Sequence, residues 1–341
     1  METPSFWIDH FTPGDEEIYN RFIALRPADC FEALEEIGAP RIKGVRFESP
    51  ENRVFGFGDL VLKFFRPDRW SLDALKDELQ FLEDLRDAEV PFVRPVGKIG
   101  TWRGIHYLAF HTIPKPYETD PKVLKEPDVR KMVHIVAKIH EVGALRDAHA
   151  RPRFDLRAMC DGSFEIILRN DFLPKTLRKQ YKDAIDRLAD LAEAFGTIPL
   201  QRIHGDSFSG NALWRPDGPV FMDLDDFQMG PTAMDIPLLS FPWRLDTLSD
   251  SMDRKERRVI QHRLVLDMYR QVRPFEEAWE PLIPLTRGCR NVLFDAWLSA
   301  RWNEPGFNEI YEDDDLMDEQ WWSGAVKGLE RAAEDHLKGW P

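Results

Sequence analysis

The segment RIHGDSFSGNALWRPDGPVFMDLDD, residues 202–226, constrains this chain more than any other stretch. It places Asp206 after a His-Gly pair, Asn211 five residues later, and Asp223 at the end of an apolar run. Phosphoryl transfer needs a carboxylate for the acceptor hydroxyl and oxygen ligands for Mg²⁺, and a loop of this spacing supplies both. A surface hairpin with solvated acids at its edges is the ordinary explanation of any one of these residues. Their combination favours a phosphotransfer site.

The N-terminal part of the chain predicts a β-rich unit with one inserted helix. The runs GVRFES, RVFGFG and LVLKFF, within residues 44–65, predict an antiparallel meander. Leucines at helical spacing predict a helix over residues 71–90, with Ser71 as its N-cap. Residues 92–114 add two strands with a turn predicted at Gly100, so the helix follows the third of five strands.

Beyond this unit the pattern becomes helical. Residues 128–143 and 175–196 predict long helices, and most of residues 234–341 predicts helices and loops. The predicted fold class is therefore α+β with two lobes. A small nucleotide-binding lobe takes residues 1–111, and a larger, mainly helical lobe with the catalytic loop and acceptor site takes residues 112–341. A cleft between two lobes is a common place for a ligand.

Lys63 lies inside the third predicted strand, where a buried ammonium needs an anionic partner. Glu78, in the middle of the predicted helix, and an ATP phosphate are the candidate partners. A solvent-facing edge lysine and a solvated helix glutamate explain each residue equally well alone. The order of strand lysine, helix glutamate and then the acids of residues 206–223 is typical of a kinase-type site.

The chain lacks the usual glycine-rich nucleotide loops. It has no G-x-x-x-x-G-K-[ST] run, and FGFGD lacks the third glycine of a kinase-type loop. The turn ESPENR, residues 48–53, is therefore the candidate phosphate-covering turn, with Ser49 and Asn52 as donors to ATP. A plain β-turn is the alternative.

Several other polar residues are predicted to play structural parts. Asp235 precedes an apolar run and is expected to cap loop amides near the site. Asp225 and Asp226 are expected to support the metal site from behind, and His140 to pack at a helix end. The acidic run at residues 312–315 is expected to be a solvated loop.

Composition and charge indicate which kinds of partner and which cellular compartment suit this chain. The formal net charge of −14 argues against a nucleic-acid binder, because phosphate backbones need basic surface. No apolar run is long enough to span a membrane, and the N-terminus has acids where a signal peptide needs positive charge. Cys30, Cys160 and Cys289 show neither metal-ligand spacing nor a disulfide framework. These features predict a cytoplasmic protein.

HGDSFSGN followed by FMDLDD resembles the motif of the aminoglycoside phosphotransferase and choline kinase superfamily, which has the protein-kinase-like fold. SPENRVFGF, LVLKFFRPDRW and FDAWLSARW are similar, in the same order, to segments of the bacterial stress response kinase A family. The resemblance runs from about residue 20 to about residue 325. Phe208 departs from it, since one member of the family pattern carries His there.

The resemblance implies that Mg²⁺ is the cofactor, that ATP is the co-substrate, and that residues 107–114 are the hinge receiving adenine. It also implies that Asp206 is the proton acceptor and that Asn211 and Asp223 are metal ligands. Lys63 would contact the ATP phosphates and pair with Glu78. Ser49 would lie in the turn that covers the nucleotide. Members of the family are described as Ser/Thr protein kinases acting in stress responses.

The spacing after the catalytic loop bears on the acceptor. Only residues 224–234, eleven in all, separate Asp223 from Asp235, which leaves no room for a long activation segment. Gly205 also replaces the arginine that would hold a phosphorylated activation loop. The sequence thus predicts transfer to a hydroxyl held by the helical lobe, and a protein Ser/Thr acceptor rests on the resemblance alone. A small-molecule phosphotransferase of the aminoglycoside, choline or homoserine kinase type and a non-catalytic nucleotide-binding scaffold are the alternatives.

Overall fold

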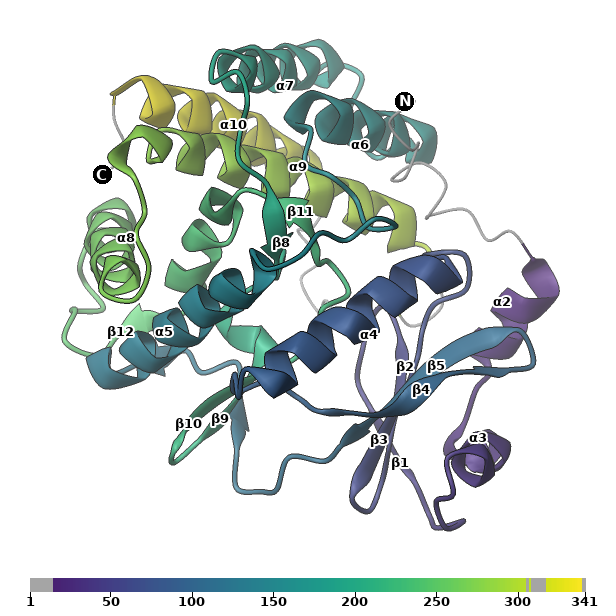
Figure 1. Cartoon of the computed structure of the whole chain (residues 1–341). Coiled ribbons are helices and arrows are strands. Elements are labelled where there is room, and N and C mark those ends of the chain that lie inside the picture. The colour runs from purple at the N-terminus through teal and green to yellow at the C-terminus, as the bar shows by residue number, and fades with distance from the viewer. Residues whose placement is uncertain (1–14, 305–306, 308–316, 339–341) are drawn as a thin grey trace.

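The small lobe is built on a five-stranded antiparallel sheet with the order β1-β2-β3-β5-β4 (Figure 1). The computed structural model describes residues 15–304, 307 and 317–338. The strands of this sheet are β1 (Val45–Phe47), β2 (Arg53–Phe57), β3 (Leu60–Phe64), β4 (Pro95–Trp102) and β5 (Ile105–His111). The first three form the predicted meander, which the structure confirms.

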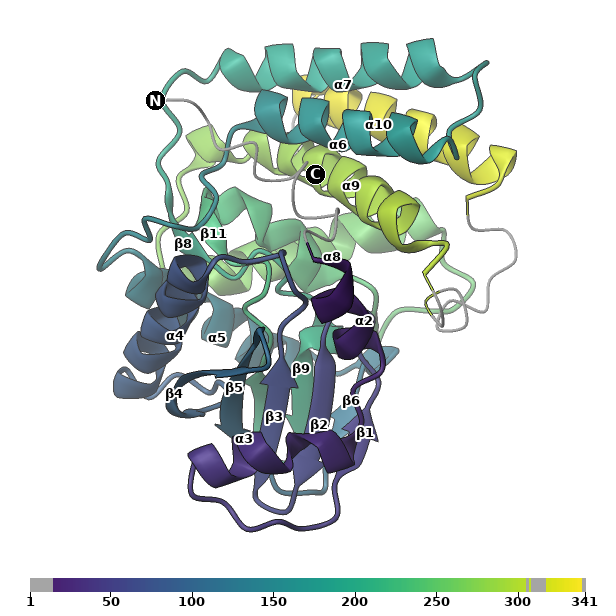
Figure 2. The same ribbon diagram turned by 90° about the vertical axis from the view of Figure 1, so that its right-hand side faces the viewer.

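Helix α4 (Leu72–Asp87) is inserted between β3 and β4, as predicted from its leucine spacing. The Ser71 side chain caps it by accepting a hydrogen bond of 3.2 Å from the Ala74 N–H. Two shorter helices, α2 (Glu16–Ile23) and α3 (Phe31–Glu36), also belong to this lobe (Figure 2). Among these helices only α4 was expected to carry a site residue.

The turn between the last two strands is not at Gly100, where it was predicted. Strand β4 continues through Gly100 to its end, and the turn is made by Arg103 and Gly104, both with positive φ. A Cβ atom on Gly100 would lie 2.2 Å from the ring of Tyr107, its cross-strand partner. The glycine therefore makes room for a tyrosine on the next strand.

The large lobe is mainly helical, and its layer of α6, α7, α9 and α10 lies farthest from the sheet (Figures 1 and 2). Its helices are α5 (Glu126–Gly143), α6 (Leu156–Asn170), α7 (Arg178–Glu193), α8 (Arg254–Arg270), α9 (Leu282–Arg301) and α10 (Glu319–Lys338). Its short strands are β6 (Glu118–Thr119), β7 (Val123–Leu124), β8 (Gln201–Ile203), β9 (Ala212–Arg215), β10 (Gly218–Phe221), β11 (Gln228–Gly230) and β12 (Arg244–Leu245). The predicted α+β class with a small β-rich and a larger helical lobe is confirmed.

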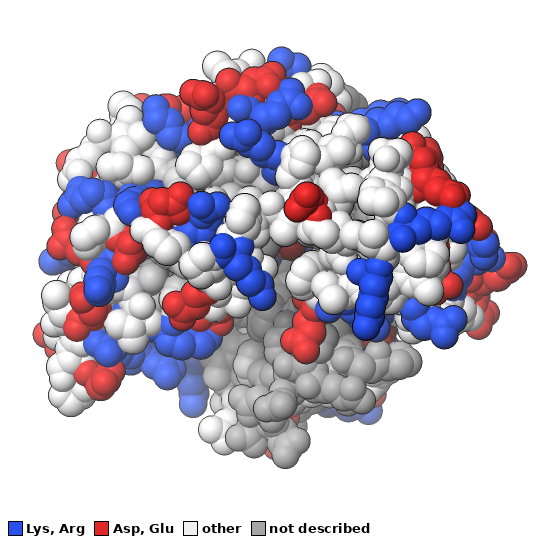
Figure 3. All heavy atoms as spheres, turned by 90° about the horizontal axis from the view of Figure 1, so that it is seen from below, with Lys and Arg blue, Asp and Glu red and all other residues white. Residues whose placement is uncertain are grey.

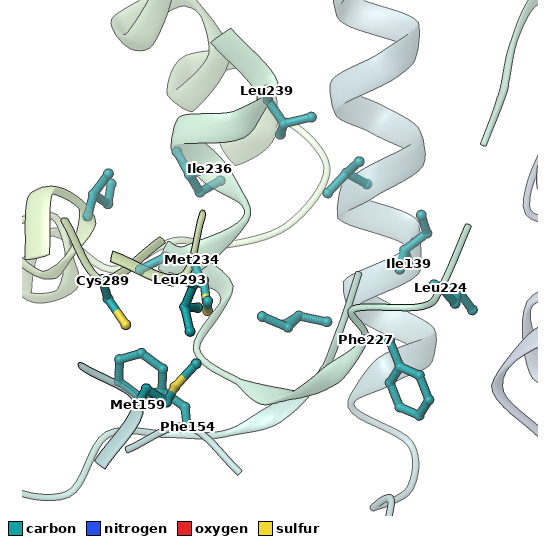
Figure 4. Close-up of a cluster of buried hydrophobic side chains, with 14 of the residues drawn as sticks. Ile139, Phe154, Met159, Leu224, Phe227, Met234, Ile236, Leu239, Cys289 and Leu293 are labelled. Carbon is teal, nitrogen blue, oxygen red and sulfur yellow. The ribbon is translucent and has the colours of Figure 1, made fainter. Parts of the chain in front are cut away.

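The larger hydrophobic core fixes the segment that follows Asp223. Figure 4 shows Leu224 and Phe227 from that segment beside Ile139 of α5, within a cluster that also takes side chains from α6 and α9. Apolar side chains of α4 join the same core, so α4 packs against the large lobe as well as the sheet. The lobe boundary at residue 111 stays a prediction.

The surface carries both signs of charge. Basic and acidic side chains are interspersed over the face drawn in Figure 3. No helix of the described ranges is both long and apolar enough to cross a membrane. The acidic run at residues 312–315, predicted to be a solvated loop, lies outside the described residues.

Candidate active site

The predicted catalytic loop follows β8 and is hydrogen-bonded to Asp235. The Asp235 carboxylate is fully buried and accepts hydrogen bonds from the backbone N–H groups of His204, at 3.0 Å, and Gly205, at 2.9 Å. This is the amide-capping geometry that the sequence predicts. Gly205 has φ +82°, and a Cβ atom there would lie 2.0 Å from the Asp226 carbonyl oxygen. Only glycine allows the loop to approach that backbone so closely.

A buried histidine keeps Asp235 in its ionised form. His140 is fully buried, with Nε2 2.9 Å from Asp235 Oδ2 and Nδ1 2.7 Å from the Tyr269 hydroxyl. Burial lowers the pKa of His140, so it is neutral and donates from Nε2 while Nδ1 accepts from Tyr269. Burial opposes ionisation of Asp235, but the hydrogen bonds from His140 and from the His204 backbone bring the pKa of Asp235 below its usual value. His140 therefore packs at the helix end, as predicted, and also supports the loop.

Both carboxylate oxygens of Asp206 have partners. Its Oδ2 accepts a hydrogen bond of 2.9 Å from Asn211 Nδ2, which also donates to the Asp206 carbonyl at 2.8 Å. Its Oδ1 forms an ion pair with Arg290 of α9. The carboxylate is 20% exposed, so it remains reachable from solvent. Sequence spacing gave no sign of Arg290, which is far from the loop along the chain.

A β-hairpin brings Asn211 and Asp223 together. Strands β9 and β10 pair with Ala212 opposite Phe221, and the Met222 N–H donates to the Asn211 carbonyl at 3.0 Å. Asp223 is the next residue, with φ +65° and a side chain 41% exposed. Aspartate tolerates this left-handed conformation better than most residues, and such outliers concentrate at functional sites.

The chemistry of these donors fits a metal-nucleotide complex. The described residues contain no group of three or more His, Cys, Asp or Glu that could hold a metal ion alone. Mg²⁺ is usually bound by one or two carboxylates together with substrate phosphates and water. Because Asn211 Nδ2 donates to Asp206, its amide oxygen and the Asp223 carboxylate are the protein ligands available for such an ion.

Lys63 lies closer to aspartates than to its predicted partner. Its Nζ is 2.8 Å from Asp223 Oδ1, forms an ion pair with Asp225, and is 3.9 Å from Glu78 Oε1. Burial disfavours the ammonium, but the charges of Asp223, Asp225 and Glu78 raise the pKa of Lys63. Lys63 is therefore charged, and it links β3 of the small lobe to the segment after β10.

Glu78 pairs chiefly with Arg151, a residue that sequence analysis did not single out. The two side chains form a buried ion pair, and Arg151 NH1 donates to the Asp225 carbonyl at 2.8 Å. The Arg151 guanidinium also lies 4.0 Å from the Trp70 ring centroid and 4.4 Å from that of Phe227. Burial raises the pKa of Glu78. Arg151 therefore connects Glu78 of α4 with the backbone at Asp225, two residues after the predicted metal ligand Asp223.

Replacing Glu78 with Gln is expected to lower the free energy of unfolding by about 3–5 kcal/mol, because Arg151 would become a buried charge without its partner. Urea denaturation followed by circular dichroism measures the change. Asp183→Asn is the control. Among the described residues Asp183 pairs with Lys179 alone, on an exposed helix face, so the substitution should change stability by about 0.5 kcal/mol or less. Equal stabilities of the two variants would contradict the importance of the buried pair.

The turn at residues 48–53 contacts Asp225, one of the acids paired with Lys63. The Asn52 side chain is buried, donates from Nδ2 to Asp225 and accepts from the Arg66 N–H at 3.3 Å. Ser49 Oγ accepts a hydrogen bond of 3.2 Å from the Asn52 N–H. The Asn52 amide is thus directed at Asp225, and a nucleotide contact by Ser49 or Asn52 stays a prediction.

Glu51 anchors this turn to the large lobe. It is 7% exposed and accepts hydrogen bonds from Arg66 Nε at 3.0 Å, Trp297 Nε1 at 2.9 Å and Arg301 NH2 at 3.1 Å. Burial opposes its ionisation, but Arg301 and Arg66 hold the pKa of Glu51 well below its usual range. Trp297 and Arg301 belong to the segment FDAWLSARW, which sequence comparison marked without assigning a role.

Arg69 bridges two neighbouring acids, Asp225 and Asp226, that follow Asp223 in the chain. It donates to Asp225 Oδ2 at 3.0 Å and to Asp226 Oδ1 at 2.7 Å. Burial opposes ionisation of both acids, and the charges of Lys63 and Arg69 bring the pKa of Asp225 below its usual value, whereas burial raises the pKa of Asp226. Both acids therefore follow the predicted metal ligand Asp223 closely in the chain and are paired with cations.

The predicted hinge, residues 107–114, begins in β5 and continues beyond it. Residues 111–113 line a hollow of about 480 Å³ together with Phe92, Arg215 and Val220. Adenine binding by the hinge stays a prediction.

The chain is similar to known phosphotransferases in sequence and in fold. Residues 46–275 match the phosphotransferase enzyme family. A serine/threonine protein kinase named RdoA from Salmonella typhimurium is 31% identical over 299 residues, covering 84% of this chain and 86% of its own. Stress response kinase A from Escherichia coli K12 is 29% identical over the same coverage.

Solved structures show the same fold at low sequence identity. An amicoumacin kinase in complex with AMP-PNP and Ca²⁺ has a TM-score of 0.68 at 13% identity, over 94% of this chain and 96% of its own. A microcompartment-associated aminopropanol kinase has a TM-score of 0.64 at 17% identity, over 90% and 97%. Taken with the sequence relatives, these structures identify a kinase-type fold. The chain therefore belongs to the phosphotransferase enzyme family, in its stress response kinase A branch.

Proposed function

We propose that this phosphotransferase transfers the γ-phosphoryl group of Mg²⁺-ATP to a Ser or Thr hydroxyl of a protein, in the cytoplasm and in a bacterial stress response. The observation that carries the proposal is the hairpin that sets Asn211 beside Asp223 while Asn211 also holds Asp206. The relatives named as serine/threonine and stress response kinases support the protein acceptor and the stress role.

Each residue of the site has a defined part in this reaction. Asp206 orients the acceptor hydroxyl and receives its proton as the new oxygen–phosphorus bond forms. Lys63 holds the phosphates of ATP, with Asp225 and Glu78 fixing its position. When bound by Asn211 and Asp223, Mg²⁺ supplies positive charge to the phosphoryl oxygens.

A small-molecule acceptor is the second candidate, and one observation favours it. The segment between Asp223 and Asp235 is short, and it returns directly to pair β11 with β8. It therefore offers no long activation segment for docking a peptide. Structures with the same fold include kinases of amicoumacin and aminopropanol, which are small molecules.

An acceptor assay separates these candidates. The purified chain would be given γ-labelled ATP and Mg²⁺ with a pool of Ser/Thr peptides and, separately, with a panel of amino-alcohols and aminoglycosides. We expect label on peptide hydroxyls. Label on small molecules alone would favour the second candidate. ATP binding without transfer to either would favour a non-catalytic nucleotide-binding scaffold.

A further inference from the structure

Arg290 lies on the face of α9 that borders the candidate active site. Its NH2 group forms an ion pair with Asp206 Oδ1 and lies 3.9 Å from Asp226 Oδ2. Trp297 and Arg301, which bind Glu51, follow seven and eleven residues later and so share that face of the helix. One rigid helix thus touches both the catalytic loop and the turn predicted to cover the nucleotide.

Each described acid around the catalytic loop has a cationic partner from this chain, and Asp223 and Asp225 share one, Lys63. An acceptor with an ammonium group normally needs an unpaired carboxylate in its site, because a buried cation without a partner is costly. The described acids of this cluster pair as follows: Asp206 with Arg290, Asp223 and Asp225 with Lys63, and Asp226 with Arg69. Arg290 is the cation paired with Asp206, the carboxylate proposed to receive the acceptor's proton.

Arg290 stays charged and has capacity for a second anion. Burial disfavours the guanidinium, but the charges of Asp206 and Asp226 raise the pKa of Arg290. A guanidinium has five N–H donors in a fixed fork, and the pair with Asp206 uses one nitrogen. The side chain is 21% exposed, so another anion can reach it.

An aromatic surface continues from Arg290 along the helix. Phe294, one turn later, is 37% exposed, and its ring stacks on Trp297 with 5.7 Å between centroids. This ring can pack against an apolar side chain of a peptide whose carboxylate binds the neighbouring guanidinium.

We propose that Arg290 is a positioning residue that fixes the Asp206 carboxylate and selects hydroxyl acceptors with an acidic group beside the hydroxyl. Arg290 holds Oδ1 while Asn211 holds Oδ2, so the carboxylate keeps one orientation. The acceptor hydroxyl gives its proton to Asp206, its oxygen bonds to the γ-phosphorus, and ADP leaves with the electrons of the broken bond. This inference rests on the proposed function and names its substrate class, a Ser/Thr peptide with a neighbouring Asp or Glu.

Matched peptides test the inference. Ser peptides that differ only in an Asp or a Lys next to the serine would be compared by kcat/KM, together with an amino-alcohol. For the wild type we expect at least about a tenfold preference for Asp, the size of one charge-assisted hydrogen bond. Arg290→Gln should reduce this preference to about twofold or less and lower kcat by about tenfold or more, since Asp206 loses its orientation. Arg290→Lys keeps the charge and should keep most of the preference, with a lowered kcat.

Arg287→Gln is the matched control. Arg287 lies one turn earlier on α9 and pairs with Asp335 of α10 at 2.8 Å, so its loss should leave the preference between the two peptides unchanged. Thermal unfolding of each variant checks its folding, and Arg290→Lys carries the test if Arg290→Gln does not fold. A wild type that prefers Lys peptides or amino-alcohols, or an Arg290→Gln variant that keeps the Asp preference, would overturn the inference alone. Absence of transfer to every acceptor would overturn the proposed function with it.

Discussion

Asp206→Asn is expected to lower kcat by about 10³-fold, because a positioned general base contributes roughly 10²–10⁴-fold. The amide keeps the shape of the side chain but cannot receive the proton of the acceptor. Nucleotide affinity should change little, since the described contacts of the Asp206 side chain are with Asn211 and Arg290 and not with Lys63. Phosphoryl transfer to a labelled peptide and binding of a fluorescent ATP analogue measure the two quantities.

Asp217→Asn is the control for this variant. Asp217 lies between β9 and β10 at the far end of the same hairpin, pairs with Arg215, and has a side chain 70% exposed. Its substitution should leave transfer within about twofold of the wild type, because exposed ion pairs contribute little. Undiminished transfer by Asp206→Asn would remove this residue from the chemical step.

Asp223→Asn is expected to weaken binding of Mg²⁺-ATP and to lower kcat by about 10²–10³-fold, the usual effect of removing one electrostatic stabiliser of the transition state. Asparagine accepts the left-handed conformation that Asp223 adopts, so the hairpin should fold unchanged. The variant should still bind ATP without metal, because Lys63 keeps Asp225 as a partner.

Titration of ATP with and without Mg²⁺, followed by calorimetry, measures this effect. The wild type should bind ATP more tightly with Mg²⁺ than without it, and Asp223→Asn should lose most of that difference. A variant with the same Mg²⁺ dependence as the wild type would show that Asp223 is not a metal ligand. The two variants thus separate the proton-transfer role from the metal role.

The main features of the fold were predictable because they depend on local patterns. Short β-rich runs separated by turn residues predicted the meander, and leucine spacing with Ser71 predicted α4. The candidate catalytic loop could be proposed from sequence because Asp206 and Asn211 lie within one short segment and the hairpin follows at once. Gly100 was misassigned because a glycine that makes room for a cross-strand tyrosine resembles one that makes a turn.

The partners of the site residues were not predictable in the same way. Arg151 binds Glu78 from 73 residues away, and Arg290 binds Asp206 from 84 residues away. Such ion pairs have no periodicity or spacing and arise only when α4 and α9 pack beside the catalytic segment. The pairing of Lys63 with Asp223 and Asp225, closer than Glu78, has the same origin. The sequence therefore suggested candidate reactive residues but not the cations that contact them.

A structure of the chain with Mg²⁺ and a non-hydrolysable ATP analogue would show directly whether Asp206, Asn211 and Asp223 form a phosphotransfer site. We expect a metal ion about 2.1 Å from the Asn211 amide oxygen and from the Asp223 carboxylate, the usual distance for Mg²⁺. We also expect Lys63 on the nucleotide phosphates and Asp206 facing the γ-phosphate across the space for an acceptor hydroxyl. A metal bound elsewhere, or a nucleotide whose γ-phosphate points away from Asp206, would contradict these roles.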